Sequence, residues 1–367
     1  MKQLTLATML GLLLAMSAAA TEISVRPIVT GINNPWGMVW LPDGDMLITA
    51  KTGKILRVRD GKIAAELSGV PDVSVNGQGG LMDIELHPDF ADNQILYLSY
   101  ATDIEMSGEA GEKGSNTAIM RARLDGDTLT DARVLYKATP NSRRGQHYGS
   151  RLEFGGDGHL YFSIGDRGQR DVNPQDPTRD GGKIYRITAD GDIPTDNPFA
   201  AHAQNKRAIY SFGHRNPQGM ARHPQTGKIW VHEHGPRGGD ELNLINAGAN
   251  YGWPILSYGI NYSGTKFAKG TEREGFESPI WYWVPSIAPS GMTFVTSEKF
   301  PEWQGHLLVG SLKFNYLVLV AMDGDKATGA QIVAEKIGRA RNVRQGPDGM
   351  IYVSVEGVGI KRITPSK

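Results

Sequence analysis

The chain has 367 residues, among them 46 glycines, 20 prolines and no cysteine, and its 39 basic residues balance 39 acidic ones. A formal net charge of zero excludes an electrostatic case for binding nucleic acid or an anionic membrane surface. Without cysteine the chain cannot form disulfides, so packing or metal ions must hold it together. The hydrophobic content of 40% is that of a soluble globular protein, and a closed all-β architecture can use this much chain as one domain.

The N-terminal stretch differs from the rest of the chain. "MKQLTLATMLGLLLAMSAAA" has a lysine near its start, an apolar centre and an Ala-x-Ala ending. This pattern predicts a signal peptide over residues 1–20, cleaved near Ala20, and a bacterial periplasmic protein. No later stretch approaches the roughly 20 apolar residues that a spanning helix needs, so no membrane span is expected.

From residue 36 onward one sequence pattern recurs: a short apolar strand, a turn with Pro, Asp or Gly, and a second strand rich in β-formers. Its copies, starting at Trp36, Gly80, Ser150, Gln218, Gly291 and Asn342, are "WGMVWLPDGDMLITA", "GLMDIELHPDFADNQILYLSYA", "SRLEFGGDGHLYFSIG", "QGMARHPQTGKIWVHEHG", "GMTFVTSEKFPEWQGHLLVGS" and "NVRQGPDGMIYVSV". Asp-Gly and Pro-Asp-Gly accept the backbone angles of tight hairpin loops, so each copy predicts a β-hairpin.

Six similar hairpins predict an all-β, six-bladed β-propeller of four-stranded antiparallel blades. A hairpin cannot bury both of its faces alone, so six copies are expected to pack as six sheets around a common axis. A β-sandwich is the alternative, but it does not explain six repeats of one hairpin. We therefore expect a single propeller domain over residues 21–367. Propellers bind ligands at the mouth of the central channel, and the fold alone names no function.

Reactive side chains recur at equivalent ends of the predicted inner strands. They are Gln78, His147, Asp166, Arg215, Asn216, Lys313, Arg339 and Arg341. In a propeller this predicts convergence on one mouth of the channel. Taken alone, His147 is more typical of a structural histidine. The three cations Lys313, Arg339 and Arg341 would suit a ligand with several carboxylates if they meet, although the two arginines could equally form only surface ion pairs.

The stretch "HEHGPRGGDE", residues 232–241, follows the fourth hairpin. Its glycines and proline leave the backbone approachable, and carbonyl oxygens are ligands that hard cations such as calcium prefer. Glu241 lies ten residues before Tyr251, and the two could clamp a second ion. Spacing alone favours the simpler interpretation that Asp240 and Glu241 are solvated turn acids. The alternating oxygen ligands of an EF-hand are missing.

Together these motifs resemble a known family. "GQGGLMDIELHPDF", "GQHYGSRL", "YFSIGD", "GHRNPQGM", "EHGPRGGDELN", "NYGWP", "SGMTF" and "GSLK" are similar to the soluble pyrroloquinoline-quinone (PQQ)-dependent sugar dehydrogenases, and most similar to their periplasmic aldose sugar dehydrogenase branch. The resemblance runs from about residue 24 to 365. It implies a six-bladed propeller that binds PQQ and calcium above the central channel and passes electrons from aldose sugars to an external acceptor.

The resemblance implies a role for each matching residue. His147 would be the general base, Asp166 would orient its ring, and Arg215 would stabilise negative charge on the quinone. Residues implied to bind the cofactor are Gln78, Arg215, Asn216, Lys313, Arg339 and Arg341. The carbonyls of Gly235 and Pro236 would hold the cofactor calcium, Glu241 and Tyr251 a structural calcium, and Tyr282 and Trp283 would contact the sugar. His234 stands where the glucose dehydrogenase branch has glutamine, so the fine cofactor contacts can differ here.

Two other classes of function remain open on the sequence. One is a metal-dependent sugar-lactone hydrolase, which needs calcium held by side-chain oxygens at the channel centre. The other is a non-catalytic sugar-binding propeller. The presence of His147, Asp166, Arg215 and the three cations favours the dehydrogenase. We expect a monomer or weak dimer.

Overall fold

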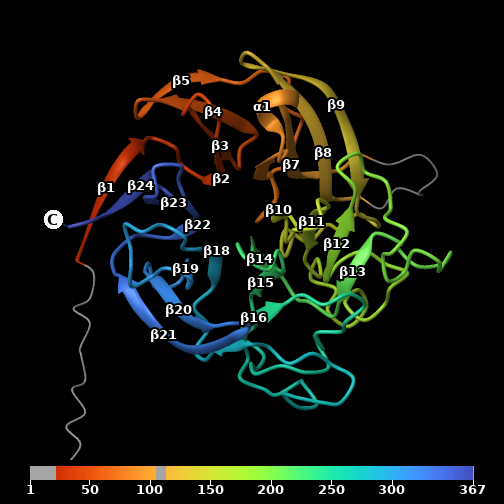
Figure 1. Ribbon diagram of the computed structural model, residues 1–367. Coiled ribbons are helices and arrows are strands. Elements are labelled where there is room, and N and C mark those ends of the chain that lie inside the picture. Colours follow the sequence, from red (N-terminus) through yellow and green to blue (C-terminus); the bar gives the residue numbers. More distant parts are fainter. Residues whose placement is uncertain (1–21, 105–112, 367) are drawn as a thin grey trace, which may run out of the picture.

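The protein is described by a computed structural model covering residues 22–104 and 113–366. The predicted signal peptide, residues 1–20, lies outside the described residues. Six four-stranded sheets are arranged as a ring around a central axis (Figure 1). The predicted six-bladed β-propeller is confirmed.

Every pair of neighbouring strands within a blade is antiparallel. Blade 1 comprises β2 (Pro35–Trp40), β3 (Met46–Ala50), β4 (Lys54–Arg59) and β5 (Lys62–Glu66). Blade 2 comprises β6 (Leu81–Leu86), β7 (Ile95–Thr102), β8 (Asn116–Asp125) and β9 (Thr128–Lys137), with the short helix α1 (Phe90–Asn93) between its first two strands. Blade 3 comprises β10 (Leu152–Phe154), β11 (Leu160–Ile164), β12 (Lys183–Ile187) and β13 (Ile209–Phe212).

The remaining three blades follow the same plan. Blade 4 comprises β14 (Pro217–Arg222), β15 (Ile229–Glu233), β16 (Asp240–Leu244) and β17 (Trp281–Trp283). Blade 5 comprises β18 (Pro289–Phe294), β19 (Leu307–Ser311), β20 (Leu317–Asp323) and β21 (Lys326–Ala334). Blade 6 comprises β22 (Ala340–Gln345), β23 (Ile351–Val355), β24 (Gly359–Pro365) and β1 (Ile23–Thr30).

The six repeated hairpins are the two innermost strands of the six blades. The first strands β2, β6, β10, β14, β18 and β22 each contact the next one around the axis, which closes the ring. The outermost strand of blade 6 is β1, the first strand of the chain, which pairs with β24 near the C-terminus. This pairing joins the two ends of the chain, so that the last blade is completed by the first segment.

The faces between blades are packed with apolar side chains. One cluster joins blades 2 and 3, where Phe162 of β11 stacks on Tyr185 of β12 with ring centroids 4.8 Å apart. Strands β11, β15, β19 and β23 are fully buried, as second strands inside a multi-blade ring should be. In the described ranges no helix is long and apolar enough to span a membrane.

Replacing Phe162 tests the packing between blades 2 and 3. Phe162 has no exposed surface, so Phe162→Ala should lower the free energy of unfolding by about 3–5 kcal/mol. The control is Val134→Ala on β9, where the side chain is 39% exposed and the loss should be below about 1 kcal/mol. Denaturant unfolding followed by circular dichroism measures both. Equal losses would contradict the assigned packing.

Candidate active site

One face of the propeller collects the polar residues. Because the first two strands of each blade are antiparallel, the start of the first strand and the end of the second lie at the same face. His147 precedes β10 and Asp166 follows β11, so both lie at this face. The other residues predicted from strand ends occupy equivalent positions: Gln78, Arg215, Asn216, Lys313, Arg339 and Arg341.

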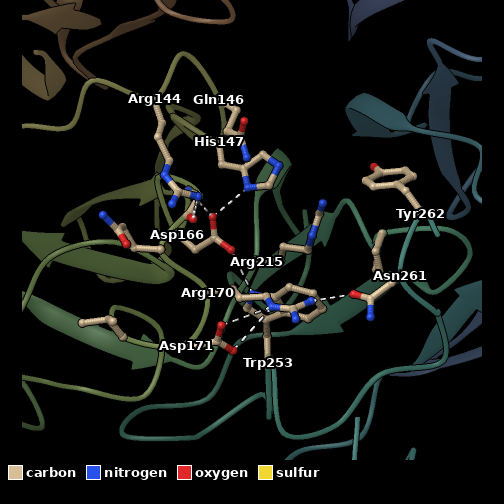
Figure 2. A pocket seen from close by; sticks show the side chains of 14 residues that line it. Arg144, Gln146, His147, Asp166, Arg170, Asp171, Arg215, Trp253, Asn261 and Tyr262 are labelled. Atoms are coloured by element: carbon tan, nitrogen blue, oxygen red, sulfur yellow. Dashed lines mark hydrogen bonds and ion pairs between the residues drawn. The ribbon is translucent and has the colours of Figure 1, made fainter. Parts of the chain in front are cut away.

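The side chain of His147 is bonded to Asp166. The Nδ1 of His147 donates a hydrogen bond of 2.6 Å to Oδ1 of Asp166, drawn as a dashed line in Figure 2. This bond fixes the orientation of the ring and does not involve the other ring nitrogen, Nε2. The backbone of His147 has φ of 57°, and its amide donates to Oε1 of Gln78 at 2.8 Å. A non-glycine residue in the left-handed region is costly, so the surrounding contacts must hold it there.

Asp166 is itself held by several donors. Its side chain is 1% exposed, and it accepts hydrogen bonds from Nε1 of Trp253 at 2.9 Å and from the amide of Gly168 at 2.7 Å. The amide of Asp166 donates to the carbonyl of Arg215 at 2.7 Å. These bonds fix the carboxylate in the orientation that the histidine needs.

The electrostatics of the pair keep the histidine neutral. Burial lowers the pKa of His147 below its usual 6.5, and the positive charge of Arg215 adds to this, while Asp166 opposes it. Burial alone would raise the pKa of Asp166, but His147, the charge of Arg215 and the amide of Gly168 together outweigh it, and the pKa falls below 3.8. The pair therefore consists of a carboxylate and a neutral imidazole at neutral pH. Because Nδ1 donates to the carboxylate, the lone pair is on Nε2.

Arg215 lies beside the pair and is 7% exposed. Its Nη1 donates to the carbonyl of His234 at 2.9 Å, and its guanidinium lies 5.3 Å from the ring of Trp253. Its amide donates to the buried carboxylate of Glu233, which also accepts from Nδ1 of His214. Both the backbone and the head group of Arg215 are thus positioned by partners at the end of β15.

Asn216 carries a buried donor with no hydrogen-bond partner. Its Oδ1 accepts from the amide of Gly149 at 3.1 Å, whereas its Nδ2 has none in the described part of the chain. An unpaired buried amide is costly, and a ligand oxygen is one group that could satisfy it. This observation fits a cofactor that reaches Asn216.

A cavity of about 320 Å³ opens beside His147, and we call it the His147 cavity. Figure 2 shows the His147–Asp166 pair on one side of it and Tyr262 across from them. It is lined by Arg144, Gln146, His147, Asp166, Gly168, Gln169, Arg170, Asp171, Val172, Arg215, Pro236, Trp253, Asn261 and Tyr262. Most of these residues come from two long connections, 165–182 and 245–280.

Arg339 and Arg341 meet at one carboxylate. The Nε of Arg339 bonds Oε2 of Glu356 at 2.7 Å, and the Nε of Arg341 bonds Oε1 of Glu356 at 2.9 Å. Both line a second, enclosed cavity of about 210 Å³, which also contains Gln78 and which we call the Arg341 cavity. The expected ion pairs are therefore present, and both arginines still face a cavity. Lys313 is exposed, 4.9 Å from the ring of Phe314, and lines neither cavity.

The Gly-Pro turn after β15 is tightly folded around Asp240. The amide of Gly235 donates to Oδ1 of Asp240 at 2.8 Å, and the amides of Ile287 and Ala288 donate to Oδ2. Asp240 is 1% exposed, so it is not a solvated turn acid. Pro236 lines the His147 cavity, which places this turn where its carbonyls could serve a bound ion.

Glu241 faces a second carboxylate. It is the direct cross-strand partner of Glu233, and burial together with the negative charge of Glu233 raises the pKa of Glu241 well above its usual value. Glu241 is half-buried and Glu233 is buried, so a cation here would offset two neighbouring negative charges. The phenol of Tyr251 donates to the carbonyl of Leu244 at 2.5 Å, so any contribution of Tyr251 to an ion site would come from its backbone.

Tyr282 and Trp283 do not line either cavity. They belong to β17, the outermost strand of blade 4, and this strand lies away from the channel. Trp283 is 8% exposed and packs in the core between blades 4 and 5, while Tyr282 stacks on Tyr258 with ring centroids 3.9 Å apart. The structure thus gives no support to these two as sugar contacts.

Sequence reasoning did not single out Trp253 or the residues Arg144, Arg170, Asn261 and Tyr262. For Trp253 a signal was present, because it stands in the motif "NYGWP". The others lie in connections without a repeated pattern. No group of three or more His, Cys, Asp or Glu side chains suited to a metal ion occurs in residues 22–104 and 113–366. Carbonyl oxygens would therefore have to supply part of any calcium site.

The chain is similar to known proteins in both sequence and fold. The chain is 43% identical over 346 residues, 92% of this chain and 91% of the other, to the aldose sugar dehydrogenase YliI of Escherichia coli K12. The crystal structure of the soluble aldose sugar dehydrogenase of E. coli in its apo form matches with a TM-score of 0.87 and 40% identity, covering 94% of this chain and 100% of that one. The PQQ-bound aldose sugar dehydrogenase of Streptomyces coelicolor matches with a TM-score of 0.74 and 29% identity, covering 95% and 100%.

The family model for glucose and sorbosone dehydrogenases matches residues 32–361, which include all six blades in whole or in part. The chain belongs to the glucose/sorbosone dehydrogenase family.

Proposed function

We propose that this chain is a PQQ- and calcium-dependent aldose sugar dehydrogenase of the bacterial periplasm. It oxidises the anomeric carbon of an aldose to the lactone and passes the electrons to an external acceptor. The observation that carries the proposal is the His147–Asp166 pair beside Arg215 at the wall of a cavity, in a chain whose relatives are named aldose sugar dehydrogenases.

The proton-transfer step belongs to His147. Its Nε2 carries the lone pair because Nδ1 is committed to Asp166, so Nε2 takes the proton of the anomeric hydroxyl. The lowered pKa keeps the imidazole neutral and ready to act as a base. Once protonated, the imidazolium is stabilised by the carboxylate, which Trp253 and Gly168 hold in place.

Arg215 supplies positive charge next to the reacting centre. Its head group is nearly buried. Within residues 22–104 and 113–366 the guanidinium makes a single hydrogen bond, from Nη1 to the carbonyl of His234. The remaining guanidinium donors can stabilise negative charge that develops on a bound oxygen. A donor that is fixed and nearly buried stabilises such charge more than bulk water does.

The residues present fit the cofactor and the ions that the family relationship suggests. Asn216 offers an unpaired buried donor, and Arg339 and Arg341 supply positive charge for carboxylates. Gln78 lines the Arg341 cavity and accepts a hydrogen bond from the amide of His147, which lines the other cavity. When bound, PQQ supplies the two-electron acceptor for the hydride of the anomeric carbon, and calcium supplies Lewis acidity. The carbonyls of Gly235 and Pro236 would hold the cofactor ion, and Glu241 with the backbone of Tyr251 the structural one.

The sugar would be held by the outer wall of the His147 cavity. Tyr262 is 74% exposed there, and the Nη1 of Arg170 donates to Oδ1 of Asn261 at 2.8 Å. An exposed ring and a row of amide and guanidinium groups suit a polyhydroxylated ligand. These side chains replace Tyr282 and Trp283 as the proposed sugar contacts.

Reconstitution tests the proposed function as a whole. Purified chain should reduce an artificial electron-accepting dye with glucose or another aldose only after PQQ and calcium are both added. Omission of each component in turn is the control. Dye reduction that does not depend on PQQ, or none with any aldose, would rule the proposal out.

Removing the base should separate cofactor binding from turnover. His147→Ala is expected to bind PQQ but to lower kcat by about 10²–10⁴-fold, because general base catalysis contributes on that scale. The control is His202→Ala, an exposed histidine beside Phe199, which should leave kcat unchanged. Retained turnover in His147→Ala would remove the base assignment.

The pH dependence follows from the direction of the His147 pKa. Activity requires the neutral ring, so kcat/KM should be highest above that pKa and should fall as the pH drops through it. Because the pKa is below 6.5, this acid limb of the pH profile should lie below pH 6.5. In Asp166→Asn the imidazolium loses its stabilising charge, so the acid limb should move to still lower pH while the maximum rate falls. Asp171→Asn, an exposed carboxylate on the same cavity wall, should leave the limb in place. A limb that moves upward in Asp166→Asn contradicts the coupling.

Calcium should stabilise the chain through Glu241. In wild type, calcium at about 100 times its Kd should add about 2.7 kcal/mol of stability, measured as a rise in Tm that a chelator reverses. Glu241→Gln should lose part of this gain and, without calcium, be at least as stable as wild type because the repulsion with Glu233 is relieved. Glu274→Gln, at an exposed position, should keep the full gain. An unchanged calcium response in Glu241→Gln would contradict the site.

A further inference from the structure

Lys51 occupies a strand-end position equivalent to those of the site residues. It directly follows β3, the second strand of blade 1, as His234 follows β15 and Glu356 follows β23. Its backbone is fixed on both sides: its amide donates to the carbonyl of Asn34, and its carbonyl accepts from the amide of Leu81, each at 3.0 Å. The fold therefore places the side chain at the same face as His147.

The ammonium group of Lys51 faces the Arg341 cavity. It lines this cavity, and its Nζ donates to the carbonyl of Gly77 at 2.5 Å. The next residue, Gln78, also lines the cavity and accepts the amide hydrogen of His147. Lys51 is thus bonded to the residue next to Gln78, and Gln78 in turn is bonded to His147 of the other cavity.

The charges that line the Arg341 cavity do not balance. Three cations, Lys51, Arg339 and Arg341, face a single carboxylate, Glu356, which both arginines already share. Burial and the nearby charge of Arg341 lower the pKa of Lys51, while Glu356 opposes this. An enclosed cavity with excess positive charge favours an anion, because a ligand carboxylate would relieve the repulsion among the cations.

We propose that Lys51 is a cofactor-binding residue that, with Arg339 and Arg341, holds a carboxylate of the quinone in the Arg341 cavity. The assignment rests on the proposed function, which supplies a ligand bearing several carboxylates. It adds a cation from blade 1 to those predicted from blades 5 and 6. The amide of Gln78 lies at the junction, so one planar ligand could reach both cavities.

Titration of the apoprotein with PQQ tests this assignment without using activity. In Lys51→Met, which keeps the length of the side chain and removes its charge, the Kd for PQQ should rise roughly tenfold or more, as expected for the loss of a charged hydrogen bond. Lys51→Arg should recover most of the affinity. The matched control is Lys54→Met in the same turn, where the lysine pairs with Glu66 on the surface, and its Kd should equal that of wild type. Thermal unfolding of each apoprotein shows that it is folded.

Three results would overturn the assignment. Wild-type affinity in Lys51→Met shows that the ammonium does not contact the cofactor. Equal weakening in Lys51→Met and Lys51→Arg shows that the lysine supports the Gly77 turn rather than binding an anion. If wild type itself does not bind PQQ, the proposed function fails and the ligand assigned to this cavity fails with it.

Discussion

The site depends on the antiparallel pairing of the first two strands in every blade. This pairing brings the residue before the first strand and the residue after the second to one face of the ring. Repeated around the axis, it places His147, Asp166, Arg215 and Arg341 within a single region although they span most of the chain. Pairing of β1 with β24 completes blade 6 from the two ends of the chain, so the ring that aligns these groups also depends on contacts far from them.

Buried carboxylates do much of the positioning at this face. Asp166 accepts a hydrogen bond from His147, and Glu233 accepts one from the backbone of Arg215. Asp240 accepts hydrogen bonds from both the Gly235 turn and the loop before β18, and so holds the two together. Each is satisfied by several donors, which offsets the cost of burying its charge. Glu241 differs, because it faces Glu233 and its one side-chain hydrogen bond among residues 22–104 and 113–366 is a long one from Asn243. That difference is why we place a cation beside Glu241.

Much of this arrangement could be predicted from the sequence. The repeated hairpins predicted the ring and its six blades, and strand ends predicted that His147 and Asp166 lie at one face, because turn chemistry and alternation are local signals. The pairing of β1 with β24 could not be foreseen, since it joins opposite ends of the chain. Tyr282 was assigned to the sugar from a motif, but it lies on an outermost strand. Lys51 was overlooked because no residue at either end of the first hairpin was singled out.

The cavity wall marks the limit of such reasoning. Residues of the connections 165–182 and 245–280 follow no period, so their contacts, such as Arg170 with Asn261, are set by tertiary packing alone. They differ in this respect from the strand-end residues. Substrate preference would therefore reside in the part of the molecule that the repeat does not specify.

A crystal structure of the chain with PQQ, calcium and an aldose would test the account most directly. We expect the quinone at the face that carries Gln78 and Arg215, with a carboxylate in the Arg341 cavity and the anomeric hydroxyl of the sugar within hydrogen-bonding distance of Nε2 of His147. A cofactor bound elsewhere, or a sugar whose anomeric hydroxyl lies out of reach of His147, would contradict the account.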